Sequence, residues 1–125
     1  MKQARLTLRR KAEFDNAFRR GRRKRVGSLI VYAFEYTPPT GRGILFGFQV
    51  KRKFGNAVVR NKVRRRLKEA ARLIAKGGSG DWDIVVVATK ESTSRSYRKI
   101  AEDLATALKR VGLEARECSI DCSSS

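Results

Sequence analysis

Few side chains in this sequence could carry out acid–base or metal chemistry. There is no histidine, so an imidazole general acid or base is excluded. Carboxylates remain, and they form three close pairs without further ligand-like residues nearby. One pair flanks a tryptophan at the entry to a strand, where turn chemistry explains it, and another is expected on the outside of a helix. We therefore expect no metal centre in the protein itself. The pairs are Glu13 with Asp15, Asp81 with Asp83, and Glu102 with Asp103.

The two cysteines, Cys118 and Cys122, lie close together in a polar stretch near the end of the sequence. Their spacing is not that of a redox CxxC motif, and no histidine is present to complete a zinc site. We interpret them as incidental reduced thiols, as expected for a cytoplasmic protein.

The charge balance points to an anionic partner. Thirty Lys and Arg residues against twelve Asp and Glu residues give a net charge of +18 in 125 residues. Nucleic acid is the commonest partner that offsets so much positive charge. Membrane binding is the alternative, but the apolar stripes are needed for the core, no run reaches transmembrane length, and no signal peptide is recognisable. We expect a cytoplasmic protein that does not bind membranes.

The most informative stretch, residues 51–72, reads KRKFGNAVVRNKVRRRLKEAAR. It predicts a turn at Gly55-Asn56 and then a helix to about residue 76, with Asn56 capping the first turn. One face of this helix is an apolar stripe that is expected to contact the core. Another face carries a cation every fourth residue. The stripe is Val59, Val63, Leu67, Ala70 and Ile74, and the cations are Arg60, Arg64, Lys68 and Arg72, joined by Asn61 and Arg65.

Like charges four residues apart destabilise an isolated helix, and only Glu69 is near enough to neutralise them. A solvated basic face is one interpretation. Arginine outnumbers lysine, however, and the guanidinium group suits bidentate phosphate contacts and base stacking. We therefore expect this face to bind a polyanion.

A short helix is predicted from about Arg10 to Arg20, with Gly21 as its stop. It places Phe14 and Phe18 four residues apart on one face. The two rings could simply pack on the sheet, which the residues alone favour, or they could line a groove where bases stack. A second basic cluster, RRGRRKR at 19–25, follows the helix.

The remaining pattern predicts paired strands at 28–36 and 43–50, a buried strand at 82–89 and a helix at 94–111. The order helix, strand, strand, helix, strand, helix indicates an α+β sandwich with helices packed on one mixed sheet. If the two strands of the strand–helix–strand unit at 43–89 are parallel neighbours, the general rule predicts a right-handed crossover between them. We expect a single domain at 1–112 and a disordered tail at 113–125.

The central stretch resembles the signature of the bacterial ribonuclease P protein family, a strand, a loop and a basic helix. The specific part is GNAVxRN in register with its flanking lysines and arginines. The resemblance extends to FDNAFRRG, to the strand with Tyr32 and to DIVVVA, and covers about residues 5–112. The matching positions are Lys53, Gly55, Asn56, Ala57, Val58, Arg60, Asn61, Arg64, Arg65, Lys68 and Glu69.

The resemblance implies a two-layer sandwich of about four mostly antiparallel strands and three helices, similar to a ribosomal small-subunit protein domain, with a left-handed crossover. It also implies a protein subunit of ribonuclease P, which binds a catalytic RNA and helps it to remove the 5′ leader from precursor tRNA. Catalysis would reside in that RNA and its bound Mg²⁺, with no activity from the protein alone and no protein partner required.

The resemblance also assigns two groups of site residues. The basic helix would face the catalytic RNA, and a central cleft would take the single-stranded leader, which reverses the interpretation of the two phenylalanines. Arg66 and Arg52 depart from common family residues and would make the helix face and the cleft edge more basic. The RNA-facing group is Lys53, Asn56, Arg60, Asn61, Arg64, Arg65 and Lys68, and the cleft group is Phe14, Phe18, Tyr32, Lys51 and Arg52.

Two other functions are compatible with parts of the sequence. A structural RNA-binding protein, such as a ribosomal protein with a small sandwich, would explain the charge and the core but not the GNAVxRN register. A protein-only nuclease would need a carboxylate-bound metal pair, for which the acidic residues show no cluster.

Overall fold

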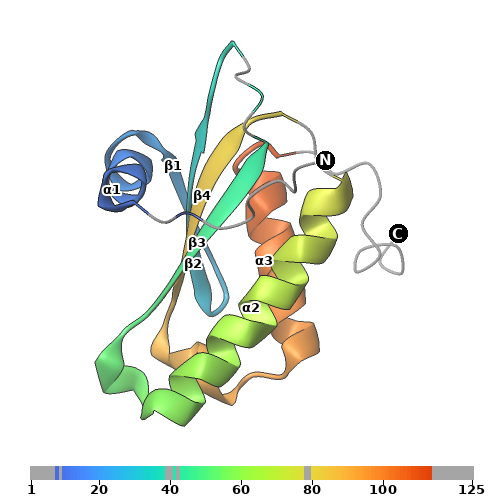
Figure 1. Ribbon diagram of the computed structural model, residues 1–125. Helices are drawn as coiled ribbons and strands as arrows, with labels where there is room; N and C mark the ends of the chain where they lie inside the picture. The colour runs from blue at the N-terminus through green and yellow to red at the C-terminus, as the bar shows by residue number, and fades with distance from the viewer. Residues whose placement is uncertain (1–7, 9, 39–40, 42, 78–79, 114–125) are drawn as a thin grey trace, which may run out of the picture.

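The computed structural model describes Leu8, residues 10–38, Gly41, residues 43–77 and residues 80–113. Four strands form one sheet, with α2 and α3 on one face and the short helix α1 on the other (Figure 1). The α+β sandwich is confirmed, and α1 adds partial cover to its second face. The elements are α1 (Lys11–Arg20), β1 (Arg22–Val26), β2 (Leu29–Glu35), β3 (Ile44–Val50), the 3₁₀ turn η1 (Arg52–Phe54), α2 (Ala57–Gly77), β4 (Trp82–Ala88), η2 (Lys90–Ser94) and α3 (Tyr97–Arg110).

The strand order is β1-β2-β4-β3, so the prediction that β2 and β3 pair with each other is wrong. Strand β4 lies between them, antiparallel to β2 and parallel to β3. Between β2 and β3, Gly41 and Gly43 lie beside the start of β4, where the Asp81 carboxylate accepts hydrogen bonds from their backbone N–H groups. The expected turn chemistry is confirmed for Asp81 and is wrong for Asp83, which lies fully buried within β4 and accepts a hydrogen bond from the Tyr36 hydroxyl.

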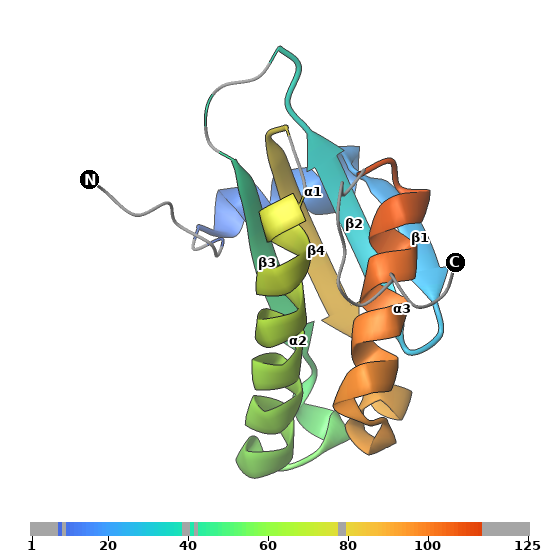
Figure 2. The ribbon, with the colours of Figure 1, turned by 90° about the vertical axis from the view of Figure 1, so that its right-hand side faces the viewer.

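The β3–α2–β4 crossover is left-handed. In Figure 2, α2 and α3 face the viewer, β3 and β4 run downwards, and β4 lies to the right of β3. The handedness implied by the resemblance is confirmed, and the right-handed default does not apply to this chain.

Alternation along the strands separates two apolar clusters. The main core lies between the sheet and the helices α2 and α3, where Leu29, Val31, Phe46, Ile84 and Val86 point. The opposite side chains form a smaller cluster beneath α1, which includes Leu45 and Val85. The same strands therefore supply both the core and the floor of the second face.

Helix α2 follows its sequence pattern closely. Val63, Leu67, Ala70 and Ile74 are all buried, as the apolar stripe predicts. The Asn56 side-chain oxygen accepts a hydrogen bond from the Val59 N–H at 3.0 Å, which confirms the predicted cap.

Strand β1 was not predicted, because four of its five residues are Arg or Lys and nothing in them alternates in polarity. It is an edge strand that pairs only with β2, and its backbone supplies the pairing. A tight turn at Gly27, with φ of 57°, joins the two strands. The basic cluster at 19–25 is thus largely a strand.

Asp103 corrects a second expectation. It was placed on the outside of its helix, yet it is 5% exposed and accepts hydrogen bonds from both the backbone N–H and the hydroxyl of Ser28, each at 3.2 Å. It shares a face with Ile100, Leu104 and Ala107, at spacings of three and four residues, so helical geometry turns it inward. The Asp103 carboxylate therefore ties α3 to the β1–β2 turn.

The domain extends one residue beyond the predicted boundary at residue 112. Gly112 follows α3 with φ of 107°, as a helix stop should, and the Leu113 N–H donates to the Leu108 carbonyl at 3.0 Å. Leu113, assigned to the tail, is 2% exposed and packs in the main core. Residues 114–125, with both cysteines, lie outside the described residues.

We expect Asp103→Ala to lower the free energy of unfolding by about 2 kcal/mol, because two buried donors of Ser28 lose their acceptor. The neighbouring substitution Glu102→Ala, at an exposed ion pair, should change it by less than about 0.5 kcal/mol. Urea unfolding of the two variants tests this, and equal losses would show that Asp103 is not an anchor.

Candidate nucleic-acid interface

Helix α1 crosses the second face of the sheet and contacts it through Ala17, a residue with a small side chain. Ala17 is fully buried, and Phe14 and Phe18 lie together on one flank of it, where they pack as half-buried rings against the cluster that contains Leu45 and Val85. The predicted packing of both rings on the sheet is therefore confirmed, and both also remain partly exposed.

Gly47 lets the Phe14 ring lie directly on strand β3. A Cβ atom at position 47 would lie 2.5 Å from Phe14 Cζ, closer than real Cβ contacts allow. Gly47 pairs with Val85, which in turn pairs with Tyr32, so one row of the sheet runs beneath both rings of α1. An isolated glycine in a strand is a known sign of such a close approach.

Tyr32 forms the other end of this row. Its ring meets the Phe18 ring edge to face, with centroids 4.7 Å apart. Arg23 of strand β1 donates from Nε to the Tyr32 hydroxyl at 3.3 Å, and its guanidinium lies 6.0 Å from the ring centroid. The structure thus brings together the three predicted aromatic residues and adds a cation to them.

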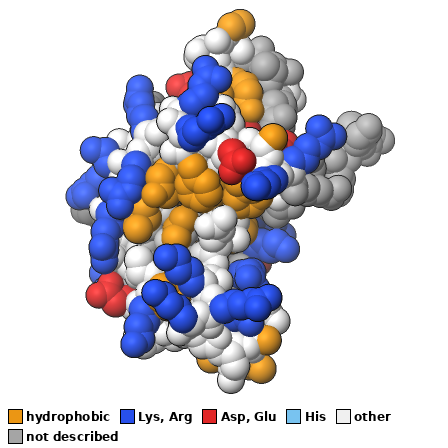
Figure 3. All heavy atoms as spheres, turned by 90° about the vertical axis from the view of Figure 1, so that its left-hand side faces the viewer, with side chains coloured by type: hydrophobic (Ala, Val, Ile, Leu, Met, Phe, Trp, Pro, Cys, Tyr) orange, Lys and Arg blue, Asp and Glu red, His pale blue; other side chains and the backbone are white. Residues whose placement is uncertain are grey.

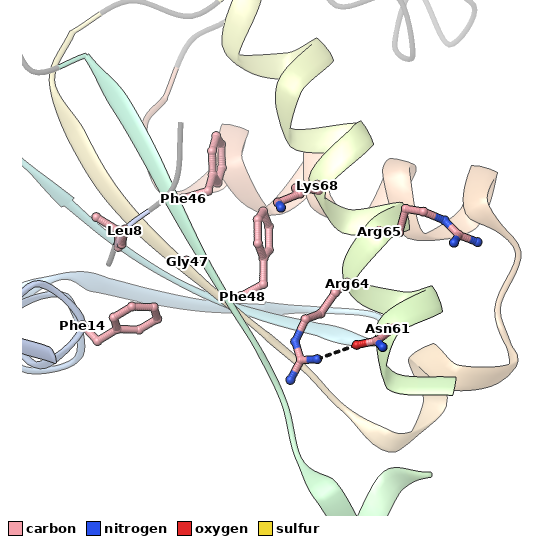
Figure 4. Close-up of a pocket in the computed structure, with 9 residues that line it drawn as sticks. All are labelled: Leu8, Phe14, Phe46, Gly47, Phe48, Asn61, Arg64, Arg65 and Lys68. Carbon is pink, nitrogen blue, oxygen red and sulfur yellow. Dashed lines mark hydrogen bonds between the residues drawn. The ribbon is translucent and has the colours of Figure 1, made fainter. Parts of the chain in front are cut away.

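A pocket continues around the edge of β3 from α1 to the basic helix (Figure 4). Phe14 and Leu8 lie on one side of the strand, and Phe48 and the polar side chains of α2 lie on the other. Aromatic surface and cationic groups therefore share one continuous concavity. The α2 residues that line it are Asn61, Arg64, Arg65 and Lys68.

Within this pocket, Arg64 is positioned by its neighbour. Its Nη1 donates to the Asn61 Oδ1 at 3.1 Å, which holds the guanidinium on the side of the strand edge (Figure 4). Arg65 and Lys68 are exposed. Four of the seven predicted RNA-facing residues thus lie together.

The other predicted residues lie at the start of α2 or before it. Arg60 donates from Nε to the Gly55 carbonyl at 3.2 Å, and Asn56 caps the helix, so both shape the loop. Lys51, Arg52 and Lys53 are exposed at the end of β3 and in η1, and they do not line the pocket. Of the predicted cleft residues only Phe14 lines it, and Phe18 and Tyr32 lie beside it.

Two arginines of α2 have local partners instead. Arg66 donates to the Arg95 carbonyl at 2.8 Å and thereby joins α2 to the start of α3, so the expectation that it adds to the basic face is wrong. Arg72 forms a bidentate pair with Glu69, with its Nη2 2.8–2.9 Å from the two carboxylate oxygens.

Basic side chains surround the apolar surface on the α1 side of the molecule (Figure 3). Within the described part of the chain, no three Cys, Asp or Glu residues gather as metal ligands, and no helix is long and apolar enough to cross a membrane. The buried acids have other partners, such as the Tyr36 hydroxyl, which donates to Asp83 at 2.7 Å.

Sequence reasoning missed Leu8, Arg23, Gly47 and Phe48. Gly47 carried a usable signal, since a lone glycine inside an apolar strand marks a close contact. Phe48 lies inside the strand predicted at 43–50 and carried no separate signal. Leu8 lies before the first predicted helix, and it is placed by its N–H, which donates to the Phe46 carbonyl at 2.7 Å.

The fold and the site define a small, strongly basic α+β protein with an aromatic groove beside a cationic helix. The family model for ribonuclease P matches residues 2–112. The ribonuclease P protein component of Ruegeria pomeroyi is 39% identical over 106 residues, covering 83% of this chain and 84% of the relative. That of a Nocardioides species is 39% identical over 107 residues, covering 86% and 92%.

Solved structures agree with these relatives. The ribonuclease P protein from Thermotoga maritima superposes with a TM-score of 0.73 at 28% identity, covering 85% of this chain and 97% of that one. The chain therefore belongs to the bacterial ribonuclease P protein family.

We expect Gly47→Ala to lower the free energy of unfolding by about 1–3 kcal/mol, because the new methyl group displaces the Phe14 ring. In a Phe14→Ala background, the same substitution should cost less than about 1 kcal/mol. Thermal unfolding of the four proteins in this double-mutant cycle measures the coupling. Additive effects would mean that the contact does not position the ring.

Proposed function

We propose that this protein is the RNA-binding subunit of a ribonuclease P, and that it holds the catalytic RNA and the 5′ leader of precursor tRNA on two adjoining surfaces. The observation that supports this most directly is the pocket around the edge of β3, where the Phe14 ring and the Arg64, Arg65 and Lys68 side chains of α2 line one concavity. Family membership supplies the ribonucleoprotein context.

The basic face of α2 is proposed to bind phosphates of the catalytic RNA. Arg65 and Lys68 are exposed, and Arg64 is oriented by Asn61. Neutralising phosphates releases counterions, so affinity should fall steeply as salt rises. The same contacts relieve the mutual repulsion of cations that repeat every fourth residue.

The surface beside α1 formed by Phe14, Phe18 and Tyr32, which joins the pocket at Phe14 and is called the leader groove below, is proposed to take the single-stranded leader. The half-exposed rings of Phe14, Phe18 and Tyr32 offer stacking surface that tolerates any base. Lys51 and Arg52 are proposed to contribute positive charge at the end of β3, and Arg23 does so beside Tyr32. Contacts to the leader favour precursor over mature tRNA, because mature tRNA has none.

Bond cleavage is proposed to occur in the RNA, with Mg²⁺ bound mainly by RNA phosphates. The buried carboxylates of the protein do not suit a metal: Asp81 and Asp103 accept backbone hydrogen bonds, and the hydroxyl of Tyr36 donates to Asp83. Mg²⁺ supplies Lewis acidity and an activated water in such reactions. The protein's own residues bind and orient the two RNAs. We propose a cytoplasmic location and no requirement for another protein.

Replacing two cations of the α2 pocket lining, the half-buried Arg64 and the exposed Arg65, in Arg64→Ala/Arg65→Ala should abolish most of the stimulation of precursor cleavage by a bacterial ribonuclease P RNA at low Mg²⁺. Two lost phosphate contacts should also reduce the salt slope of RNA binding by about 2. The variant Arg98→Ala/Lys99→Ala removes the same charge from the exposed side of α3 and serves as the control.

A control loss equal to that of the α2 variant would mean that net charge, and not the α2 face, binds the RNA. The protein without RNA should show no cleavage, and cleavage by protein alone would contradict the proposed division of labour.

Phe18→Leu should weaken binding of precursor tRNA to the holoenzyme by about fivefold to a hundredfold, because a stacking ring is lost while apolar packing is kept. Binding of mature tRNA should change by less than about twofold. Equilibrium binding of the two tRNAs tests this, and equal losses would exclude a leader-specific role.

A further inference from the structure

Two aromatic side chains of this protein, Phe34 and Tyr36, lie outside both apolar clusters. The chain has six Phe, three Tyr and one Trp, and the structure describes all of them. Eight belong to or pack against the two apolar clusters. Phe34 and Tyr36 do neither, although they lie on the same sheet face as Tyr32. Half-exposed rings that lie outside both apolar clusters, on a highly charged surface, point to a ligand.

These two rings line a second pocket, on the other flank of α1 from the leader groove. Asn16 and Arg20 are four residues apart on that flank and line it too. Phe14 and Phe18 lie on the opposite flank, and the buried Ala17 lies between. Helix α1 therefore separates two concavities on one sheet face.

The second pocket is already ordered for stacking. The Phe34 and Tyr36 rings meet edge to face with centroids 4.9 Å apart. The Arg20 guanidinium lies over the Phe34 ring, with its Cζ 5.1 Å from the ring centroid. The Tyr36 hydroxyl donates to the fully buried Asp83 at 2.7 Å, so this ring is fixed as well.

We infer that the Phe34–Tyr36 pocket binds an unpaired nucleotide of RNA, in addition to the leader groove. A base can stack on the aromatic pair or on the outer face of the Arg20 guanidinium, and Arg20 can bind its phosphate. The Asn16 side chain carries both a donor and an acceptor for a base edge. Glu35 is an exposed acid that also lines the pocket. Because its carboxylate repels phosphate, we expect a bound phosphate on the Arg20 side of the pocket.

Unpaired nucleotides could come from either RNA. A long leader could extend past α1 into the pocket, or an unpaired residue of the catalytic RNA could enter it. Both sources present the same chemistry, a base with an adjoining phosphate, and they differ in which RNA loses affinity when the pocket is altered.

The test uses Phe34→Leu, which removes a ring outside both apolar clusters, and Arg20→Gln, which removes the cation and leaves both clusters intact. Arg19→Gln, on the exposed side of the same helix, is the charge-matched control. Binding is measured for the ribonuclease P RNA with each protein. It is also measured for precursor tRNAs with leaders of about 4 and about 12 nucleotides, using each holoenzyme.

Both pocket variants should weaken binding of one RNA by about fivefold or more, and Arg19→Gln by less than about twofold. A loss confined to the longer leader assigns the pocket to the substrate, and a loss for the ribonuclease P RNA assigns it to the catalytic subunit. Wild-type affinity of both variants for all three RNAs would overturn the inference.

A second readout locates the site without relying on affinity. Addition of a short single-stranded RNA to the protein should shift the NMR signals of the Asn16 side-chain amide in the wild type and not in Phe34→Leu. An unmoved Asn16 signal in the wild type would overturn the inference. Phe18→Leu reports on the leader groove separately, so failure of one site is distinguishable from failure of the other.

Discussion

Strand β4 is the element on which both the core and the candidate interface depend. It is held from two sides, antiparallel to β2 and parallel to β3, and all of its residues except the half-buried Val87 are buried. Ile84 and Val86 point to α2 and α3, and Val85 points to α1. A shift of one residue would exchange the two sets, so the register that fills the core also places the floor of the groove.

Net charge is the second constraint. A domain with a charge of +18 repels itself, and the structure limits this by giving some cations local partners. Arg72 pairs with Glu69, and Arg66 and Arg22 donate to backbone carbonyls. Among the residues that the structure describes, Arg65 and Lys68 make no such contact and are exposed on α2. A phosphate bound at the basic face of α2 would reduce the electrostatic repulsion within the protein most.

Sequence reasoning succeeded where the signal was local. The α2 stripe and the Asn56 cap depend on spacings of three and four residues, and both were predicted. Strand order depends on contacts between distant segments, so the insertion of β4 between β2 and β3 could not be derived from either strand. Strand β1 was missed because backbone pairing with β2 stabilises it, and its Arg and Lys side chains give no apolar pattern.

The sequence predicted which aromatic residues form the site, but not how close to the sheet they lie. The predicted rings of Phe14, Phe18 and Tyr32 do gather, yet their height above the sheet depends on two small residues, Ala17 and Gly47. Ala17 lets the α1 backbone approach the sheet, and Gly47 leaves room for a ring. Side chains this close are fixed before a ligand arrives, so a stacking base need not order them. The same close approach of α1 leaves a concavity on each flank, because large side chains can only project sideways from a helix seated on alanine. The groove and the Phe34–Tyr36 pocket are thus two consequences of one helix–sheet contact.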